Sequence, residues 1–293
     1  MREINSRKLL LARIFRRAGL NSILRLIQNQ ILGVHARVIN YHDVSADSLD
    51  SFAAQLEHFR AHYVNVGRPE LDAILAGTWK SDRPGLMITF DDGLRSHAQF
   101  AAPLLEEYGF RGWFFVPTEF VKTPVDAQLD FASNHSIVPS AEDFESDRVA
   151  LSWDEIRHMD EAGHTIGSHS CHHERLASSL PPERLESEIF DSKAELERQL
   201  GHEIDVFCWV GGEEWSYSRS GAEAIRRAGY RLSFMTNNLP VRATSDPLQI
   251  QRTNVEAWFP LDVVEFQLNG LLDLVYTAKR RRIVRLTAED ASP

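Results

Sequence analysis

Residues 87–93 read MITFDDG, an apolar run typical of a β-strand that ends in two adjacent carboxylates and a glycine. Two neighbouring acids repel each other and cost stability unless a cation or a positive side chain offsets the repulsion. A metal ion at Asp91 and Asp92 would do so. For this run taken alone, the alternative is an ordinary Asp-Gly turn with exposed acids.

A second run, GSHSCHH at residues 167–173, has three histidines within five positions at the end of another expected strand. Imidazole nitrogens are good ligands for zinc and similar divalent ions. His169 and His173 can reach one ion from a single turn, and with one carboxylate they leave positions open for water and substrate. This pattern is typical of a catalytic metal site; an exposed histidine cluster is the alternative.

Outside these two runs, short β-branched or aromatic stretches alternate with helical patterns after Val34. Repeated strand–helix units predict a parallel sheet, either open and doubly wound or closed into a barrel. Both arrangements place functional groups at the carboxyl ends of the strands. The stretch 118–150 lacks clear periodicity and is a candidate substrate-binding loop or a surface insertion. The expected strands are 34–41, 86–90, 112–116, 164–168, 206–210, 231–235 and 248–253, and the clearest helices are 49–62, 95–108 and 182–200.

These motifs resemble those of the polysaccharide deacetylases of the NodB homology type, carbohydrate esterase family 4. Residues 89–93 match the family's TFDDG motif, and His169, Ser170 and His173 match its H-[ST]-x-x-H motif. The similarity covers most of the chain from Val38 onward. It implies an α/β fold, a distorted (β/α)7 barrel, which agrees with the seven expected strands.

The resemblance also implies distinct roles for the site residues. It assigns Asp91 as the general base and Asp92, His169 and His173 as ligands of one divalent metal ion, for which we expect zinc. One acid must be held by the ion while its neighbour stays free to accept a proton. The expected activity is hydrolysis of a carbon–nitrogen bond, the removal of an N-acetyl group from an amino sugar in bacterial surface polysaccharide biosynthesis.

The third family motif, roughly F-R-x-P-Y-G, is altered here to FCWVGG at residues 207–212. Cys208 therefore stands where the family has an arginine that orients the base. A main-chain N–H near Gly211 would still be able to stabilise an oxyanion. Arg252, at the end of the last expected strand, is a candidate replacement for the arginine; an ordinary surface arginine is the alternative.

A late Leu-x-His motif that supplies the proton donor in the family is also missing, because no histidine follows Gly212. His42 ends the first expected strand and would face the metal in a barrel, so we expect it to protonate the leaving amine. The alternative is a histidine that caps its strand by bonding to Asp43. We expect structural or exposed positions for the remaining histidines considered, His97, His164 and His172.

Residues 1–33 are expected to form an amphipathic helical segment ahead of a barrel domain at 34–293. Leucine and isoleucine recur at spacings of three and four, and arginines dominate the polar positions, where Glu3 is the only acid. A helix of this kind can rest on anionic lipid, which predicts a peripheral membrane contact. A helix packed on the main domain with a solvated basic face is the alternative.

Composition limits the possible partners and the cellular compartment of the protein. The net charge of −10 disfavours nucleic acid as a partner. Cys171 and Cys208 are too few for a disulfide framework and lack CxxC spacing. No run approaches the ~18 apolar residues of a membrane span, and arginines interrupt the N-terminal apolar run, unlike in a signal peptide. These features predict a cytoplasmic protein, at most peripheral at the inner membrane face.

Several alternatives stay open at the level of sequence. Removal of a formyl or another acyl group from a sugar intermediate would use the same reaction centre. The altered third motif would also suit a non-catalytic carbohydrate-binding protein of the same fold, and a scaffold anchored by the N-terminal helix is a further class. The expected partner is an amino-sugar substrate that is nucleotide-linked, lipid-linked or an oligosaccharide.

Overall fold

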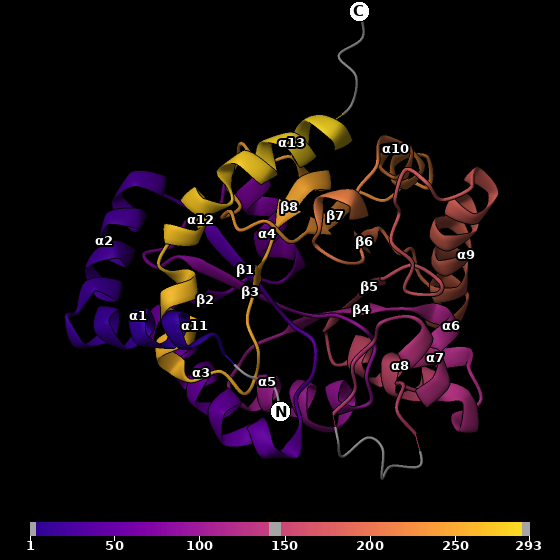
Figure 1. The fold of residues 1–293 in the computed structure, drawn as a ribbon, viewed down its shortest axis with the longest axis horizontal. Helices are drawn as coiled ribbons and strands as arrows, with labels where there is room; N and C mark the ends of the chain where they lie inside the picture. Colours follow the sequence, from indigo (N-terminus) through magenta and orange to yellow (C-terminus); the bar gives the residue numbers. More distant parts are fainter. Residues whose placement is uncertain (1–3, 141–147, 289–293) are drawn as a thin grey trace, which may run out of the picture.

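A parallel β-sheet curls into a nearly closed barrel in the computed structural model, with helices around it (Figure 1). The structure describes residues 4–140 and 148–288. The strands follow the order β8-β7-β6-β5-β4-β3-β1-β9, and β2 pairs beside β3. Their bounds are β1 Ala36–Tyr41, β2 Val64–Asn65, β3 Gly85–Phe90, β4 Gly112–Val116, β5 Thr165–Ser168, β6 Val206–Cys208, β7 Leu232–Met235, β8 Ile250–Gln251 and β9 Thr253–Asn254.

Helices follow most strands and pack against the outside of the sheet (Figure 1). None of the helices among the described residues combines the length and apolarity needed to cross a membrane. Their bounds are α1 Ser6–Arg17, α2 Leu20–Leu32, α3 Leu49–His62, α4 Arg68–Leu75, α5 Ala102–Glu107, α6 Thr118–Lys122, α7 Gln128–Asn134, α8 Trp153–Glu161, α9 Pro182–Leu200, α10 Arg219–Arg227, α11 Leu261–Leu268, α12 Leu271–Val275 and α13 Thr277–Thr287, with short helical turns η1 Ala46–Ser48, η2 His97–Ala101, η3 Val125–Ala127, η5 Glu214–Ser216 and η6 Pro247–Gln249.

The barrel closes at Arg252, which lies between β8 and β9. β8 pairs with β7, whereas β9 pairs with β1 at the other end of the sheet. The Arg252 N–H donates to the carbonyl of Met235, and its own carbonyl accepts from Asn238. One short segment of chain thus joins the two ends of the sheet and fixes the side chain of Arg252 at the closure.

Both faces of the central strands are buried, as expected for a parallel sheet covered by helices. Leu86, Ile88 and Phe90 of β3 belong to the core between the sheet and the helices, whereas Met87 of the same strand lies in a second core with Trp113 and other aromatic residues. Alternate side chains of a strand point to opposite faces. Met87, Thr89 and Asp91 therefore share one face, and this alternation directs Asp91 to the same side as the second core.

The (β/α)7 barrel expected from the sequence is confirmed, with four local differences. The expected strand 248–253 is divided into η6, β8 and β9, because the chain changes partner at Arg252. The expected helix 95–108 begins as a π-helical turn, η2, before α5. The stretch 118–150 contains α6, η3 and α7, although its residues 141–147 lie outside the described residues. The short strand β2 was not expected.

The N-terminal segment is a bent pair of helices, α1 and α2, that meet at Gly19 with φ of 68°. α1 packs on α11, where Ala12 is fully buried against Val263 and Phe266. Phe15 contacts Phe266 edge to face at 5.1 Å between ring centroids. Residues 1–3, with Arg2 and Glu3 of the expected helix, lie outside the described part of the chain.

Candidate metal centre

Asp92 follows β3 in a left-handed backbone conformation, with φ of 78°. Ser170 and His173, after β5, share this conformation, with φ of 65° and 57°. Non-glycine residues adopt it at a cost of about 1–3 kcal/mol, and such residues cluster at functional sites. Since β3 and β5 flank β4 and all three strands are parallel, these two strained turns lie at the same end of the barrel.

Asp92, His169 and His173 converge on one point. The Nε2 atoms of His169 and His173 lie 3.7 and 3.1 Å from Oδ1 of Asp92, and all three side chains are at least nine-tenths buried. Their potential ligand atoms lie within 4.8 Å of one another. The three side chains predicted to be ligands are thus brought together.

Both imidazoles are oriented by hydrogen bonds from their other ring nitrogen. Nδ1 of His169 donates to the carbonyl of Cys208 at 2.9 Å, and Nδ1 of His173 donates to the carbonyl of His135 at 2.6 Å. A carbonyl can only accept, so each Nδ1 carries a proton, which leaves Nε2 as the ring nitrogen that can bind an ion. Burial also lowers the pKa of His169 to about 4, which keeps its ring neutral.

The electrostatics at this point favour a cation. Burial opposes the charged form of His173, but the Asp92 carboxylate outweighs it and raises the pKa of that ring. Two imidazole nitrogens with one carboxylate form a donor set that suits a divalent ion, which would take the place of a proton on His173, and leaves positions open. The residues present therefore fit a catalytic metal.

Asp91 lies beside this set and is held by Arg252. The guanidinium makes two hydrogen bonds to the carboxylate, 2.6 Å to Oδ1 and 2.7 Å to Oδ2, and Asn40 donates to Oδ2 at 3.2 Å. Burial alone would raise the pKa of Asp91, but Arg252 outweighs it and holds the pKa below its ordinary value. The sequence left Arg252 open as either a replacement for the family's arginine or a surface residue; it is buried and contacts Asp91.

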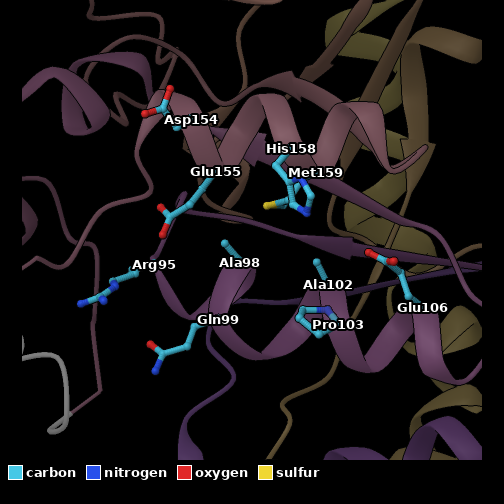
Figure 2. Close-up of a pocket in the computed structure, with 10 residues that line it drawn as sticks. All are labelled: Arg95, Ala98, Gln99, Ala102, Pro103, Glu106, Asp154, Glu155, His158 and Met159. Carbon is cyan, nitrogen blue, oxygen red and sulfur yellow. The ribbon is translucent and has the colours of Figure 1, made fainter.

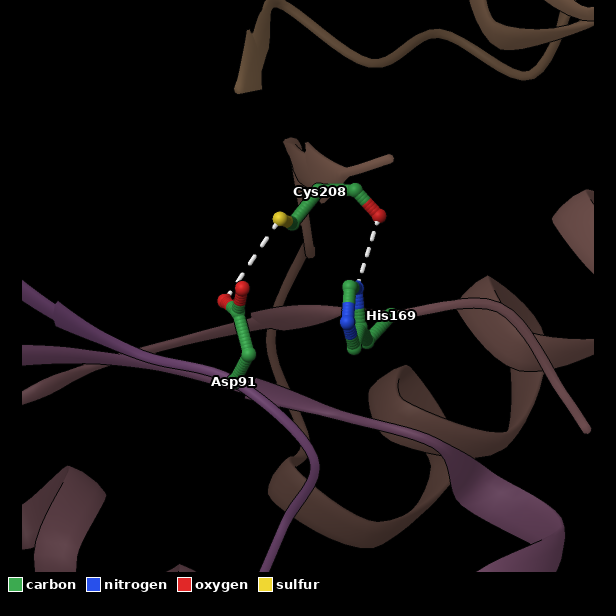
Figure 3. Close-up of side chains that lie close together, drawn as sticks. All are labelled: Asp91, His169 and Cys208. Carbon is green, nitrogen blue, oxygen red and sulfur yellow. Dashed lines mark hydrogen bonds between the residues drawn. The ribbon is translucent and has the colours of Figure 1, made fainter. Parts of the chain in front are cut away.

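Cys208 contacts the same carboxylate from β6 (Figure 3). Its Sγ lies 3.6 Å from Oδ1 of Asp91, while its main-chain carbonyl accepts from His169. Burial raises the pKa of the Cys208 thiol well above its ordinary value, so the thiol stays protonated and donates. Asp91, His169 and Cys208 are a second set close enough to share an ion. This set is a poor metal site because the thiol is protonated and Nδ1 of His169 is already bound to the carbonyl of Cys208.

His42 faces the same cavity and pairs with a residue that sequence reasoning missed. Its Nδ1 lies 2.9 Å from Oε1 of Glu256, which follows β9, and its side chain is 37% exposed. Burial opposes the charged form, but Glu256 outweighs it and raises the pKa of His42 to about 10. His42 is therefore a cation at neutral pH. Glu256 carries no motif, and only the closure of the barrel brings it to His42.

The site opens into a cavity of about 230 Å³ whose lining includes His42, Asp91, Asp92, Gly211 and Gly212. A neighbouring cavity of about 360 Å³ is shared by His42, Asp92, Val138, Glu256 and Trp258. Gly211 has φ of 79°, and its N–H has no hydrogen-bond acceptor among the described residues.

The stretch 118–150 forms part of the site's support. Phe120, Ala132 and Ile137 form a small core with Leu94, which follows Gly93. Its His135 carbonyl accepts from His173, and its Ser136 lines both cavities. The described part of the stretch therefore packs beside the candidate metal centre and is more than a simple surface insertion.

Three other histidines have structural partners. Nε2 of His97 donates to the carbonyl of His42, Nδ1 of His164 accepts from the Gly112 N–H, and His172 pairs with Glu188. His172, Cys171 and Glu188 also lie close enough to share an ion. Burial raises the pKa of Cys171 to about 12, and Glu188 is already bound by His172 and Arg184. This group therefore connects α9, which contains Glu188, to the loop that contains His172.

A larger cavity, of about 490 Å³, lies away from the metal centre between η2, α5 and α8 (Figure 2). It is lined by acidic groups and His158, but these acids have structural partners. Glu155 caps α8 through Ser152 and pairs with Arg148, and Glu106 contacts His164. This cavity has no set of convergent catalytic groups.

Comparison with known proteins agrees with this geometry. A family model described as polysaccharide deacetylase matches residues 80–233, just over half of the chain and including both motifs. The chain belongs to the polysaccharide deacetylase family. The family resemblance expected from the sequence is thereby confirmed.

Individual relatives are distant. The Bacillus subtilis protein YxkH, whose name assigns it to the polysaccharide deacetylases, is 22% identical over 207 residues, which cover 68% of this chain and 63% of YxkH. A gellan lyase from a Bacillus species is 25% identical over 60% of this chain but only 6% of its own length. The matched region thus spans less than two thirds of either relative.

Solved structures of this family share the fold. The Streptococcus pyogenes deacetylase PplD, solved with acetate, has a TM-score of 0.63 at 18% identity and covers 80% of this chain and 98% of its own. IcaB from Ammonifex degensii has a TM-score of 0.62 at 21% identity and covers 83% and 98%. At these identities the likeness supports the barrel and does not by itself assign an activity.

Proposed function

We propose that this protein is a metal-dependent N-deacetylase that acts on an N-acetylated amino sugar in the biosynthesis of a bacterial surface polysaccharide. One observation carries the proposal. Asp92 and the Nε2 atoms of His169 and His173 form an open three-ligand set beside a second buried carboxylate, Asp91. Membership of the polysaccharide deacetylase family supports the same reaction class.

Asp92, His169 and His173 would hold one divalent ion, for which we favour zinc because of the two imidazole ligands. When bound, the ion would polarise the amide carbonyl and make a water molecule more acidic. The hydrogen bonds from Nδ1 to the carbonyls of Cys208 and His135 keep both rings aimed at that position.

Asp91 acts as the general base in this proposal. Its low pKa keeps it ionised, and Arg252 fixes the direction of its carboxylate. A base whose orientation is already fixed loses little conformational entropy when it accepts the proton of the attacking water. Gly211 lines the same cavity, and its N–H is a candidate donor to the developing oxyanion.

His42 acts as the general acid on the leaving amine. An amide nitrogen needs a proton before the carbon–nitrogen bond can break. Glu256 keeps His42 charged at neutral pH, and His42 lines both cavities, so it stands between the metal centre and the space where a sugar would lie. The proposed base, Asp91, and the proposed acid, His42, thereby line the same cavity.

The test is acetate release from a soluble oligomer of N-acetylglucosamine, together with metal content. His173→Ala should lose both the ion and acetate release, whereas wild type should carry about one divalent ion per chain. Asp91→Asn should keep the ion and lose about 10² to 10⁴ in turnover, as expected for loss of a general base.

The adjacent residue gives a matched control. His172 is bound to Glu188 and is no ligand, so His172→Ala should keep the ion and the activity. Full metal occupancy in His173→Ala would contradict the ligand assignment. Formate release from an N-formyl sugar, without acetate release, would change the acyl group that we propose.

A further inference from the structure

The N-terminal helix pair exposes an apolar surface that the barrel does not cover. α1 and α2 expose large apolar side chains, and α12 adds two more that are about three-quarters exposed. Most of the large apolar residues exposed in the described part of the chain lie here. We call them the apolar face: Leu10, Leu11, Ile14, Ile23, Leu26, Ile27, Ile31, Val34, Leu274 and Val275.

This face belongs to helices that are already docked on their other side. Ala12 and Phe15 pack on α11, and Arg16 pairs with Asp262 of the same helix. Asn269, just before α12, donates to Asn21 of α2, which joins α12 to the pair. Packing on the barrel thus accounts for the inner stripe of α1 and leaves the apolar face unexplained.

The charge around this face is strongly positive, although the whole chain is acidic. Between Asn5 and Leu32 the sequence has six basic residues and no acid, whereas the chain has a net charge of −10. Arg7, Arg13 and Arg17 are exposed. A second copy of the same surface would bring these cations together and repel, so like charges disfavour a homodimer here.

We propose that α1, α2 and α12 form a docking surface for an anionic lipid bilayer. Apolar side chains on an amphipathic helix enter the boundary between headgroups and acyl chains, and arginines bind the anionic headgroups. The structure also links this surface to the catalytic site: Phe259 packs against α1, Lys8 lies 5.1 Å from its ring, and the adjacent Trp258 lines the cavity beside His42. Docking would bring that wall of the cavity close to the membrane.

Co-sedimentation of the full-length protein with vesicles tests the proposal. Wild type should bind vesicles of mixed phosphatidylglycerol and phosphatidylcholine at least about tenfold better than pure phosphatidylcholine, and high salt should weaken the binding. The triple variant Leu26→Gln/Ile31→Gln/Leu10→Gln should lose about tenfold or more. Arg13→Gln/Arg17→Gln should weaken binding to anionic vesicles only.

A matched control uses exposed apolar residues elsewhere. Val125→Gln/Phe190→Gln removes two such side chains from η3 and α9 and should bind like wild type. An unchanged thermal unfolding midpoint should accompany each variant. Equal binding by wild type and the triple variant would overturn the proposal, as would a dimer in sedimentation velocity that the triple variant dissociates.

A second measurement detects docking directly and does not depend on a variant that loses vesicle binding. Ile31→Cys labelled with an environment-sensitive dye should show a blue shift when anionic vesicles are added, because Ile31 is 75% exposed in the free protein. Val125→Cys labelled in the same way should show none. The native Cys171 and Cys208 are buried and would not take the label readily. Absence of a shift at Ile31 would overturn the proposal.

Discussion

Arg252 forms a buried ion pair with Asp91, the proposed catalytic base. Their side chains are only 6% and 1% exposed, so neither charge is stabilised by bulk water. Breaking such a pair by removing one partner strands the other charge, which typically costs about 3–5 kcal/mol. Removal of Arg252 is therefore expected to lower the stability of the fold and to change the ionisation of the proposed base.

Arg252→Gln should lower the free energy of unfolding by about 3–5 kcal/mol, measured by chemical denaturation. Without the guanidinium, burial should dominate and the pKa of Asp91 should rise. Since the base must be ionised, the acidic limb of kcat/KM should then move to higher pH. Arg227→Gln, which breaks an exposed pair with Glu186, should change stability by only about 0–1 kcal/mol and leave the pH profile unchanged.

Glu256 and His42 form a second ion pair at the site, in which the Glu256 carboxylate raises the pKa of the proposed acid, His42. Glu256→Gln should lower the pKa of His42 from about 10, because its main raising influence is removed. The acid must be protonated, so the basic limb of the pH profile should move to lower pH. An aryl ester, whose leaving group needs little protonation, should be hydrolysed by Glu256→Gln nearly as well as by wild type.

Glu223→Gln, an exposed change on α10, is the control for that variant. An unchanged basic limb in Glu256→Gln would mean that Glu256 does not set the protonation of His42. Equal loss on the ester and on the sugar amide would assign His42 a role in orientation rather than in proton donation.

At the scale of elements, the stretch 118–150 depends on Gln128. Its Oε1 accepts from the N–H groups of Val149 and Ala150 at 2.8 and 3.0 Å, and its Nε2 donates to the carbonyl of Thr123. Gln128 thereby joins the start of α7 to the segment that returns to Leu94. The buried side-chain amide of Gln128 thus connects the two ends of the segment whose His135 carbonyl accepts from His173.

Gln128→Ala should leave two buried N–H groups without a partner, and each unsatisfied group costs about 1–3 kcal/mol. We expect the free energy of unfolding to fall by about 2 kcal/mol or more and metal affinity to fall with it, because the His135 carbonyl loses its support. Calorimetry and metal titration would measure these effects. Gln99→Ala, an exposed amide change, should alter neither, and wild-type stability in Gln128→Ala would contradict the assigned role.

At the scale of the whole molecule, burial of neutral histidines limits stability in acid. Burial lowers the pKa of His97 to about 4, and its Nδ1 has no hydrogen-bond partner among the described residues. Between pH 6.5 and 4 the unfolded chain therefore binds a proton at His97 that the folded chain does not. The free energy of unfolding must fall as the pH falls through this range.

His97→Gln should reduce the slope of stability against pH between 6.5 and 4. The removed contribution is about 3 kcal/mol over that range, at about 1.4 kcal/mol for each pH unit. Gln retains a donor for the carbonyl of His42. Denaturant unfolding at several pH values would measure the slope, and His158→Gln, at an exposed position, should leave it as in wild type. Equal slopes in His97→Gln and wild type would contradict this prediction.

The sequence by itself predicted most strands and helices in their order, and its motifs, with the family resemblance, singled out Asp92, His169 and His173 as the proposed metal ligands. Apolar runs of β-branched residues indicated the strands, and Asp92, His169 and His173 follow two of them directly. Because parallel strands end at the same side of a barrel, residues that follow β3 and β5, on either side of β4, are expected to lie at one end. Local pattern, the family motifs and one rule of topology were sufficient for this part.

The tertiary structure alone decided the groups that tune this site. Arg252 reaches Asp91 over 161 positions and Glu256 reaches His42 over 214, and neither belongs to an intact motif. Both contacts depend on the closure of the barrel between β8 and β9, where two-residue strands are too short to have a recognisable period. Such pairs depend on distance in space, which no local pattern of residues contains.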